Sequence, residues 1–180
     1  HGLLIRNRTA FENSRNLTTI IFDKTGTLTK GEFGVTRFKS VAEGMDDKEL
    51  LAIAAALENS SEHPIAAGIV RKSKELELKL GKPENFQNIT GMGIKANLDG
   101  KEISILSPGG LKQKEIEQPE GAFKTEDETV VFVLSDEKLI GYIALADEIR
   151  DESQEAINTL KKHGIKILMA TGDNEIVAKA

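Results

Sequence analysis

The chain contains no cysteine, and only 4% of its 180 residues are aromatic. Without cysteine it can form neither a disulfide nor a thiolate metal site, and it has no cysteine nucleophile. A formal net charge of −5, combined with so few aromatic rings, argues against a broad nucleic-acid surface. The longest apolar runs, 51–57 and 130–134, are far too short to span a membrane. We therefore expect no nucleic-acid partner and no membrane crossing within these residues.

What the chain does contain is typical of a folded globular protein. Hydrophobic residues make up 39% of it and charged residues 29%, which is too apolar for a disordered chain. A chain of this length can bury a core in one large or two small domains. It begins at His1, without an initiator methionine or a signal-like segment, so we expect it to belong to a longer polypeptide.

The heptapeptide DKTGTLT occupies residues 23–29, directly after the apolar run 20–22. Asp23 is a candidate nucleophile, and the residues that follow it are suited to binding phosphate: Lys24, Thr25, Gly26 and Thr27. An aspartate that attacks a triphosphate brings two anions together, and unit charges 4 Å apart interact by about 4 kcal/mol at an effective dielectric of about 20. A lysine, a bound Mg²⁺ and backbone N–H groups beside a glycine can compensate that charge. The segment therefore predicts phosphoryl transfer to Asp23, and the alternative is a polar turn that closes a strand.

DKTGTLT resembles the phosphorylation signature of P-type ATPases, and this resemblance favours phosphoryl transfer over the plain turn. It implies ATP as substrate and Mg²⁺ as cofactor, held by Asp23 and by the carbonyl of Thr25. P-type ATPases belong to the haloacid-dehalogenase-like superfamily, and the loop after residue 170 resembles the second phosphate motif of that superfamily. The resemblance implies phosphate binding by three residues of this loop: Thr171, Gly172 and Asp173. For Asp173 the alternative is N-capping of a helix that starts near Glu175.

The apolar runs 18–22 and 165–170 predict buried parallel strands, each followed by a polar loop that contains glycine. A helix is expected between 147 and 165, because acidic residues begin that segment and basic residues end it before Gly164. We expect an α/β fold: an incomplete haloacid-dehalogenase-like Rossmannoid phosphorylation domain, formed by 1–34 and 146–180. An inserted α+β nucleotide-binding domain should occupy 35–145.

The insert is expected to combine a helical hairpin with an antiparallel sheet. Asp46 and Glu49 predict a capping box for a helix through Leu57, and Pro64 fits the first turn of a second helix that runs to about Leu78. Short strands should follow in two hairpins: 93–98 with 101–106, and 129–134 with 139–146. The segments 107–110 and 113–128 are predicted to be loops or exposed surface.

Two motifs of the insert, SEHP at 61–64 and GMG at 91–93, resemble the nucleotide-binding signature of the heavy-metal-transporting branch of P-type ATPases. The residues expected to bind nucleotide are Glu58, Ser61, Glu62, His63, Gly91 and Gly93. A histidine before proline can stack on adenine or hydrogen-bond to it, and glycines allow close backbone approach. Each residue has a plainer alternative, such as a capping histidine or a solvated glutamate. One departure is Ser107-Pro108, which stands where many relatives carry a Gly-Asn pair.

The resemblance as a whole implies the ATP-binding and autophosphorylating catalytic fragment of a heavy-metal ion-translocating P-type ATPase. The resemblance to the copper-exporting subgroup implies that the transported ion is copper. The parent would be an integral membrane protein with this portion on its cytoplasmic face, and the expected partners are ATP and the transmembrane and actuator parts of the same polypeptide. The family's later lysine and Gly-Asp-Gly-x-Asn-Asp motifs have no match in these residues. Two alternatives remain: a soluble aspartate-dependent phosphatase and a module that binds nucleotide without turnover.

Thr25 discriminates against the phosphatase. Phosphatases of the superfamily usually carry a second aspartate two residues after the nucleophile as general acid and base, and threonine cannot fill that role. Thr25→Asp should therefore raise turnover of a small phosphate ester, measured by phosphate release. An unchanged rate in a folded variant would contradict this account.

Overall fold

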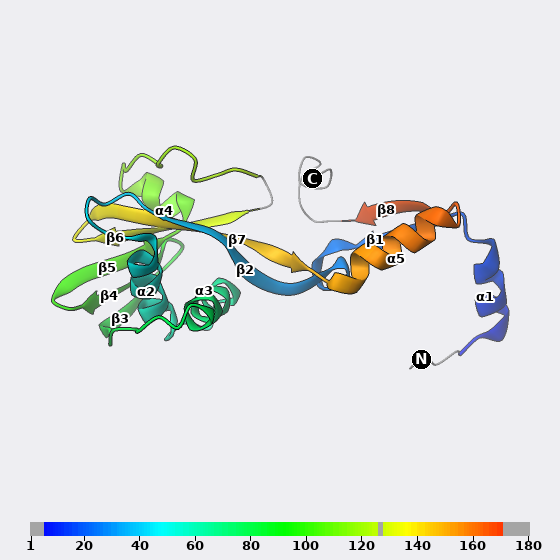
Figure 1. Ribbon diagram of the computed structural model, residues 1–180, viewed down its shortest axis with the longest axis horizontal. Coiled ribbons are helices and arrows are strands. Elements are labelled where there is room, and N and C mark those ends of the chain that lie inside the picture. Colours follow the sequence, from blue (N-terminus) through cyan, green and yellow to red (C-terminus); the bar gives the residue numbers. More distant parts are fainter. Residues whose placement is uncertain (1–5, 126–127, 171–180) are drawn as a thin grey trace. The chain divides into compact units, whose positions relative to one another are not determined.

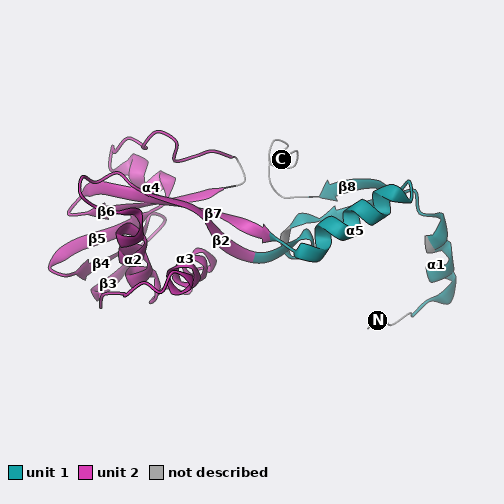
Figure 2. Cartoon of the chain, in the orientation of Figure 1, with its two compact units in different colours: residues 1–31, 149–180 teal, residues 32–148 magenta. Residues whose placement is uncertain are grey.

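A computed structural model describes residues 6–125 and 128–170 of the chain. The chain divides into two compact units, shown in teal and magenta in Figure 2: residues 1–31 with 149–180, and residues 32–148. We call them unit 1 and unit 2 and describe each by itself. Among the described residues, no helix is both long enough and apolar enough to cross a lipid bilayer.

Unit 1 contains a pair of parallel strands with a helix between them in sequence (Figure 1). Strand β1 (Thr19–Asp23) pairs in register with β8 (Lys166–Ala170), which confirms the predicted parallel pairing. The connecting helix α5 (Asp151–Lys162) has acidic residues in its first turn and lysines in its last, as the macrodipole favours. Gly164 follows it at φ +75°, the left-handed conformation expected of a glycine after a helix. A short helix α1 (Arg8–Asn13) precedes β1.

The prediction that these two strands are buried is wrong for the described structure. Exposed and half-buried residues alternate along both, and Ile21 and its partner Leu168 are 65% and 41% exposed. Side chains of a strand point alternately to the two faces of a sheet, so this alternation means that only one face is covered. The apolar composition of the runs correctly indicated strands but overstated their burial.

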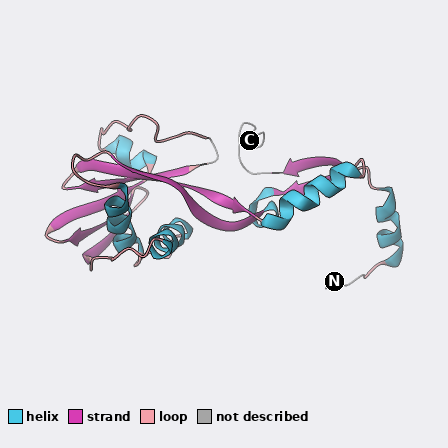
Figure 3. Cartoon of the chain, in the orientation of Figure 1, coloured by secondary structure: helices cyan, strands magenta, loops and turns pink. Residues whose placement is uncertain are grey.

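Unit 2 is built on a six-stranded sheet with the order β2-β7-β6-β5-β4-β3 (Figure 3). Its strands are β2 (Thr29–Ser40), β3 (Glu84–Ile89), β4 (Gly93–Leu98), β5 (Lys101–Leu106), β6 (Thr129–Ser135) and β7 (Lys138–Ile149). Neighbouring strands from β3 to β7 are antiparallel. Asp99 and Gly100 both have positive φ in the β4–β5 turn, as a two-residue hairpin loop requires.

The two faces of the sheet carry separate apolar clusters because side chains alternate along each strand. On β6, Val131 and Val133 belong to a cluster with helices α2 (Asp47–Glu58) and α3 (Pro64–Glu75). The intervening Phe132 belongs to the other cluster, which includes Leu111 of helix α4 (Pro108–Gln113). The sheet is therefore covered on both faces along β6.

Most predicted elements of the insert are confirmed, and the differences have local causes. Strands β4 and β5 have the predicted bounds, and the Asp46 side chain accepts the Glu49 N–H at 2.8 Å as the capping box requires. Helix α3 ends three residues early, because Glu77 at φ 53° leaves the helical conformation. The segment 107–110 is not a loop: Ser107 caps α4 by accepting from Gly110 N–H, and a proline begins the helix. Strands β2 and β3 and helix α1 were not predicted.

An ion pair of low exposure joins β2 to the segment that precedes β6. Arg37 Nη2 lies 2.5 Å from Glu128 Oε2, and Arg37 also donates to the carbonyls of Gly121 and Ala122. Burial opposes ionisation of Glu128, but hydrogen bonds from Arg37 and Thr36 outweigh it and lower the pKa of this carboxyl from 4.5 to about 2. The ionised carboxylate therefore ties Glu128, directly before β6, to strand β2.

Glu128→Gln should destabilise the protein in a pH-dependent manner. The folded-state pKa is depressed, so the stabilisation is fully present above pH 4.5 and is lost as pH falls toward 2. We expect a loss of about 3 kcal/mol at pH 7, and less than half of that at pH 3. Urea unfolding at the two pH values measures it, with exposed Glu120→Gln as control. A difference between wild type and variant that does not change with pH would contradict the assignment.

Candidate functional site

The segment after β1 forms a closed turn that begins at Asp23. Residues Lys24–Leu28 make a single π-helical turn, in which Gly26 has φ +75°. Thr29, only 3% exposed, closes it: its hydroxyl accepts the Gly26 N–H at 3.2 Å and donates to the Lys24 carbonyl at 3.0 Å. Asp23 is the last residue of the strand and is exposed. The turn thus presents a carboxylate beside a glycine backbone, the arrangement expected of a phosphate site.

Two residues that the sequence analysis missed hold this turn from the start of α5. Arg150 donates through Nε to the Thr29 carbonyl at 3.0 Å and through Nη2 to the Gly26 carbonyl at 3.3 Å. Its backbone N–H and the Ser153 hydroxyl both donate to the Leu28 carbonyl, at 3.0 and 2.9 Å. An arginine at a helix N-terminus opposes the macrodipole, and that local conflict is the sequence signal that points to another role.

The other predicted residues of this part are only partly described. Lys24, Thr25, Gly26 and Thr27 all lie within the turn. The predicted phosphate ligands Thr171, Gly172 and Asp173 lie outside the described residues. Among the residues that the structure covers, no group of three or more acidic, histidine or cysteine side chains could hold a metal.

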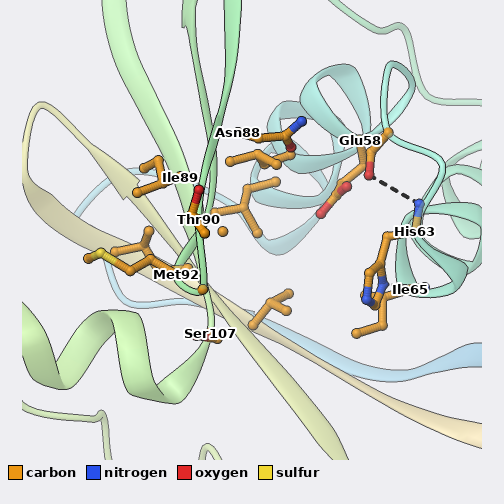
Figure 4. Close-up of a pocket in the computed structure, with 15 residues that line it drawn as sticks. Glu58, His63, Ile65, Asn88, Ile89, Thr90, Met92 and Ser107 are labelled. Atoms are coloured by element: carbon orange, nitrogen blue, oxygen red, sulfur yellow. Dashed lines mark hydrogen bonds between the residues drawn. The ribbon is translucent and has the colours of Figure 1, made fainter.

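Unit 2 contains a cavity of about 430 Å³, within the usual size of a small-molecule site. It lies where the end of α2 and the start of α3 approach the β3–β4 hairpin, and Figure 4 shows its walls. Apolar lining comes from Ile65, Ile89, Met92, Ile94, Ile105, Leu106 and Val131, and polar lining from Glu58, Ser61, His63, Asn88, Thr90 and Ser107. An apolar cavity with a few polar groups suits a flat heterocycle.

Five of the six residues predicted to bind nucleotide line this cavity, from two separate segments of the chain. Glu62 is exposed and is not among the lining residues. Asn88 and Thr90, which precede the glycine motif, were missed because their residue types carry no specific signal. In Figure 4 they lie on the hairpin side, and Glu58 and His63 lie on the helical side.

Glu58 is a carboxyl held in an apolar environment. It is the last residue of α2 and is only 6% exposed. Burial raises the pKa of Glu58 from 4.5 to about 7, and a hydrogen bond with Ser61 opposes part of this rise. At neutral pH the carboxyl is therefore present in both protonated and ionised forms.

His63 both caps α3 and faces the cavity. Its Nδ1 accepts the Ile65 N–H at 3.2 Å, and its backbone N–H donates to Ser61 Oγ at 3.3 Å, the dashed line in Figure 4. Because Nδ1 is an acceptor, the neutral ring carries its proton on Nε2. Capping, one of the plainer alternatives, is thus present, and it leaves the ring face and Nε2 for a ligand.

The two glycines have separate structural roles in the hairpin. Gly91 has φ +71°, and a Cβ there would meet nothing within 4 Å. Gly93 has φ +150°, and its Cβ would lie 1.9 Å from the Ile105 carbonyl oxygen. Gly93 therefore permits close pairing of β4 with β5, and Gly91 permits the turn that precedes it.

This fold and these sites agree with the comparisons with known proteins. The chain belongs to the haloacid dehalogenase-like hydrolases, whose family model matches residues 17–180. Within that family it resembles heavy-metal P-type ATPases: it is 48% identical to the copper-exporting P-type ATPase B of Archaeoglobus fulgidus, over 99% of this chain and 26% of that protein. It is also 37% identical to a probable cadmium-transporting ATPase of Staphylococcus aureus, over 99% of this chain and 26% of that protein.

Solved structures give the same family. A zinc-transporting PIB-type ATPase in its E2.Pi state matches with a TM-score of 0.78 and 34% identity, over 91% of this chain and 27% of that one. The catalytic domain of a CPx-ATPase, described for its conformational changes upon nucleotide binding, matches with a TM-score of 0.67 and 31% identity, over 96% and 61%. The predicted family and fold class are confirmed. The chain spans about a quarter of the curated relatives' length.

Arg150→Gln should loosen the turn that follows Asp23. The variant loses the two side-chain hydrogen bonds to the Gly26 and Thr29 carbonyls, at a cost of about 1 kcal/mol because water can reach this partly exposed site. Hydrogen exchange should quicken several-fold for the amides of residues 24–29. Exposed Glu155→Gln on the same helix is the control, and unchanged exchange in the Arg150 variant would exclude the bracing role.

Proposed function

We propose that this chain is the ATP-binding and autophosphorylating catalytic part of a heavy-metal ion-translocating P-type ATPase. In this proposal Asp23 accepts the γ-phosphoryl group of ATP and forms an aspartyl phosphate. The observation that carries the proposal is the closed glycine turn that begins at Asp23. The purine-sized cavity in unit 2 and the match to heavy-metal ATPases support it.

The transfer step uses groups at the turn. A carboxylate oxygen of Asp23 attacks the γ-phosphorus of ATP, a new oxygen–phosphorus bond forms, and the bond to the bridging oxygen breaks, so that ADP leaves with the electron pair. Lys24 and the backbone N–H groups of the turn stabilise the charge on the phosphoryl oxygens. Thr27 adds a hydroxyl donor, and Thr171, Gly172 and Asp173 are proposed to complete the phosphate site. Arg150 and Ser153 hold the turn in place.

Magnesium is the proposed cofactor. Asp23 and the Thr25 carbonyl offer two oxygen ligands, which suits Mg²⁺ because this ion usually keeps several waters and takes the remaining ligands from substrate phosphates. When bound, it would neutralise part of the charge on the transferring phosphoryl group.

Each unit has a separate proposed role. Unit 1 (1–31 and 149–180) is the phosphorylation domain, and unit 2 (32–148) is the nucleotide-binding domain. In unit 2, Glu58 would bind the adenine edge, and the His63 ring would stack on the base or donate to it from Nε2. The Gly91 turn leaves open space for close approach, and Ser61 orients Glu58 and His63.

The transport role belongs to the proposed parent protein. Its membrane and actuator parts would convert the domain movement that follows phosphorylation into ion export, with this catalytic portion on the cytoplasmic face. Copper is the proposed ion, because the relative that is 48% identical is a copper exporter. A probable cadmium-transporting ATPase and a zinc-transporting ATPase match at 37% and 34% identity.

A second candidate function is nucleotide binding without turnover, which the cavity by itself would support because all its lining residues lie in unit 2. A soluble phosphatase is less well supported, since Thr25 stands where such enzymes carry the second aspartate.

Labelling by Mg²⁺ and γ-labelled ATP, with calorimetry of ATP binding in parallel, separates these functions. The wild-type chain should gain acid-stable label that hydroxylamine releases, and Asp23→Asn should gain none although it binds ATP equally. Asp151→Asn, a change at an exposed carboxylate on α5, is the matched control and should label normally. Label that persists in the Asp23 variant would identify another nucleophile. ATP binding without any label would favour the second candidate.

A further inference from the structure

The inference concerns how the cavity of unit 2 selects its base, and it rests on the proposed function. Glu58 is the single acidic side chain among the lining residues. The only other titratable group on the described walls is His63, whose Nδ1 is already occupied by the Ile65 N–H. Every other lining residue, from α3, the β3–β4 hairpin, β5 and β6, is neutral, and no lysine or arginine lines the cavity. The carboxyl therefore has no cation to hold it ionised.

A buried carboxyl without a cation keeps its proton more readily than one in water. Glu58 is 6% exposed, and burial raises its pKa to about 7. A protonated carboxyl has one donor and one acceptor side by side, whereas a carboxylate offers two acceptors. The two forms therefore recognise different hydrogen-bonding edges.

Adenine and guanine differ in such edges. Adenine places the 6-amino donor beside a ring-nitrogen acceptor, the pattern that a carboxamide reads with two hydrogen bonds. Guanine places its N1–H and 2-amino donors together, and a carboxylate pairs with both. A protonated carboxyl matches adenine in the same way as a carboxamide does.

We propose that the protonated carboxyl of Glu58 reads adenine, donating to a ring nitrogen and accepting from the 6-amino group, so that this proton sets the preference for adenine over guanine. Loss of the proton removes the donor that the adenine ring nitrogen needs and creates the double acceptor that suits guanine. The cavity loses its adenine preference as pH rises through about 7.

Calorimetric titration of the chain with ATP and with GTP at pH 6, 7 and 8 tests this proposal. The two nucleotides carry the same triphosphate, so protonation of the phosphates cancels in the ratio of their association constants. For wild type, we expect the ATP/GTP ratio to fall at least tenfold between pH 6 and pH 8, because ATP association follows the protonated fraction of a group with pKa of about 7 and GTP association does not.

Glu58→Gln supplies the decisive comparison because a carboxamide has the shape and the donor–acceptor pair of the protonated acid. This variant should keep the wild-type ratio of pH 6 at all three pH values. Glu43→Gln, at an exposed carboxylate of unit 2 that does not line the cavity, should keep the wild-type pH dependence. Thermal melts monitored by circular dichroism verify folding. If Glu58→Gln does not fold, the pH dependence of the wild-type ATP/GTP ratio alone decides the test.

The outcomes separate this inference from the proposed function. A wild-type ratio that does not change with pH, or a Glu58→Gln ratio that falls as in wild type, would overturn the role of the proton while ATP binding stands. A folded chain that binds neither nucleotide at any pH would overturn the proposed function and this inference together. A fall of at least tenfold in wild type that is absent from Glu58→Gln would establish it.

Discussion

Unit 2 depends on the two-sided burial of β6. Val131 and Val133 pack toward α2 and α3, and Phe132 packs toward α4, so one strand joins two apolar clusters. The first of these clusters holds α2 against the sheet, and Glu58 is the last residue of that helix. Packing of the core therefore determines where this carboxyl lies and removes it from water. The chemistry of the cavity follows from that burial.

The turn after Asp23 depends on a different principle, the satisfaction of backbone hydrogen bonds. A π-helical turn of five residues cannot pair all its carbonyl groups internally, and unpaired polar groups are costly wherever water is restricted. Thr29 closes the turn from within, and Arg150 and Ser153 pair its carbonyls from α5. Residues more than 120 positions apart in sequence thus share one structure. The position of Asp23, the proposed nucleophile, is consequently a property of the folded unit.

Glycine and glutamate residues have different roles at different positions of this structure. Gly26 and Gly91 both adopt positive φ in turns beside a proposed ligand, but Gly93 is required by its own sheet. Glu58 and Glu128 are both carboxyls of low exposure, but Arg37 keeps Glu128 ionised, and nothing comparable stands beside Glu58. Opposite pKa shifts follow from the presence or absence of one guanidinium, so charge pairing is what separates a structural carboxylate from a candidate ligand group.

The sequence by itself determined the family, the parallel pairing of β1 with β8, the two hairpins and five of the residues that line the cavity, because motifs, caps and alternation are local patterns. It missed α4, whose capping serine and proline were hidden in a glycine-rich stretch, and it missed β2 and β3. Only the tertiary structure decided that Arg150 braces the turn, that Asn88 and Glu58 line one cavity, and that no lysine or arginine is among the described residues of its lining. The physical reason is that burial and partner choice depend on residues distant in sequence, and no local pattern encodes that juxtaposition.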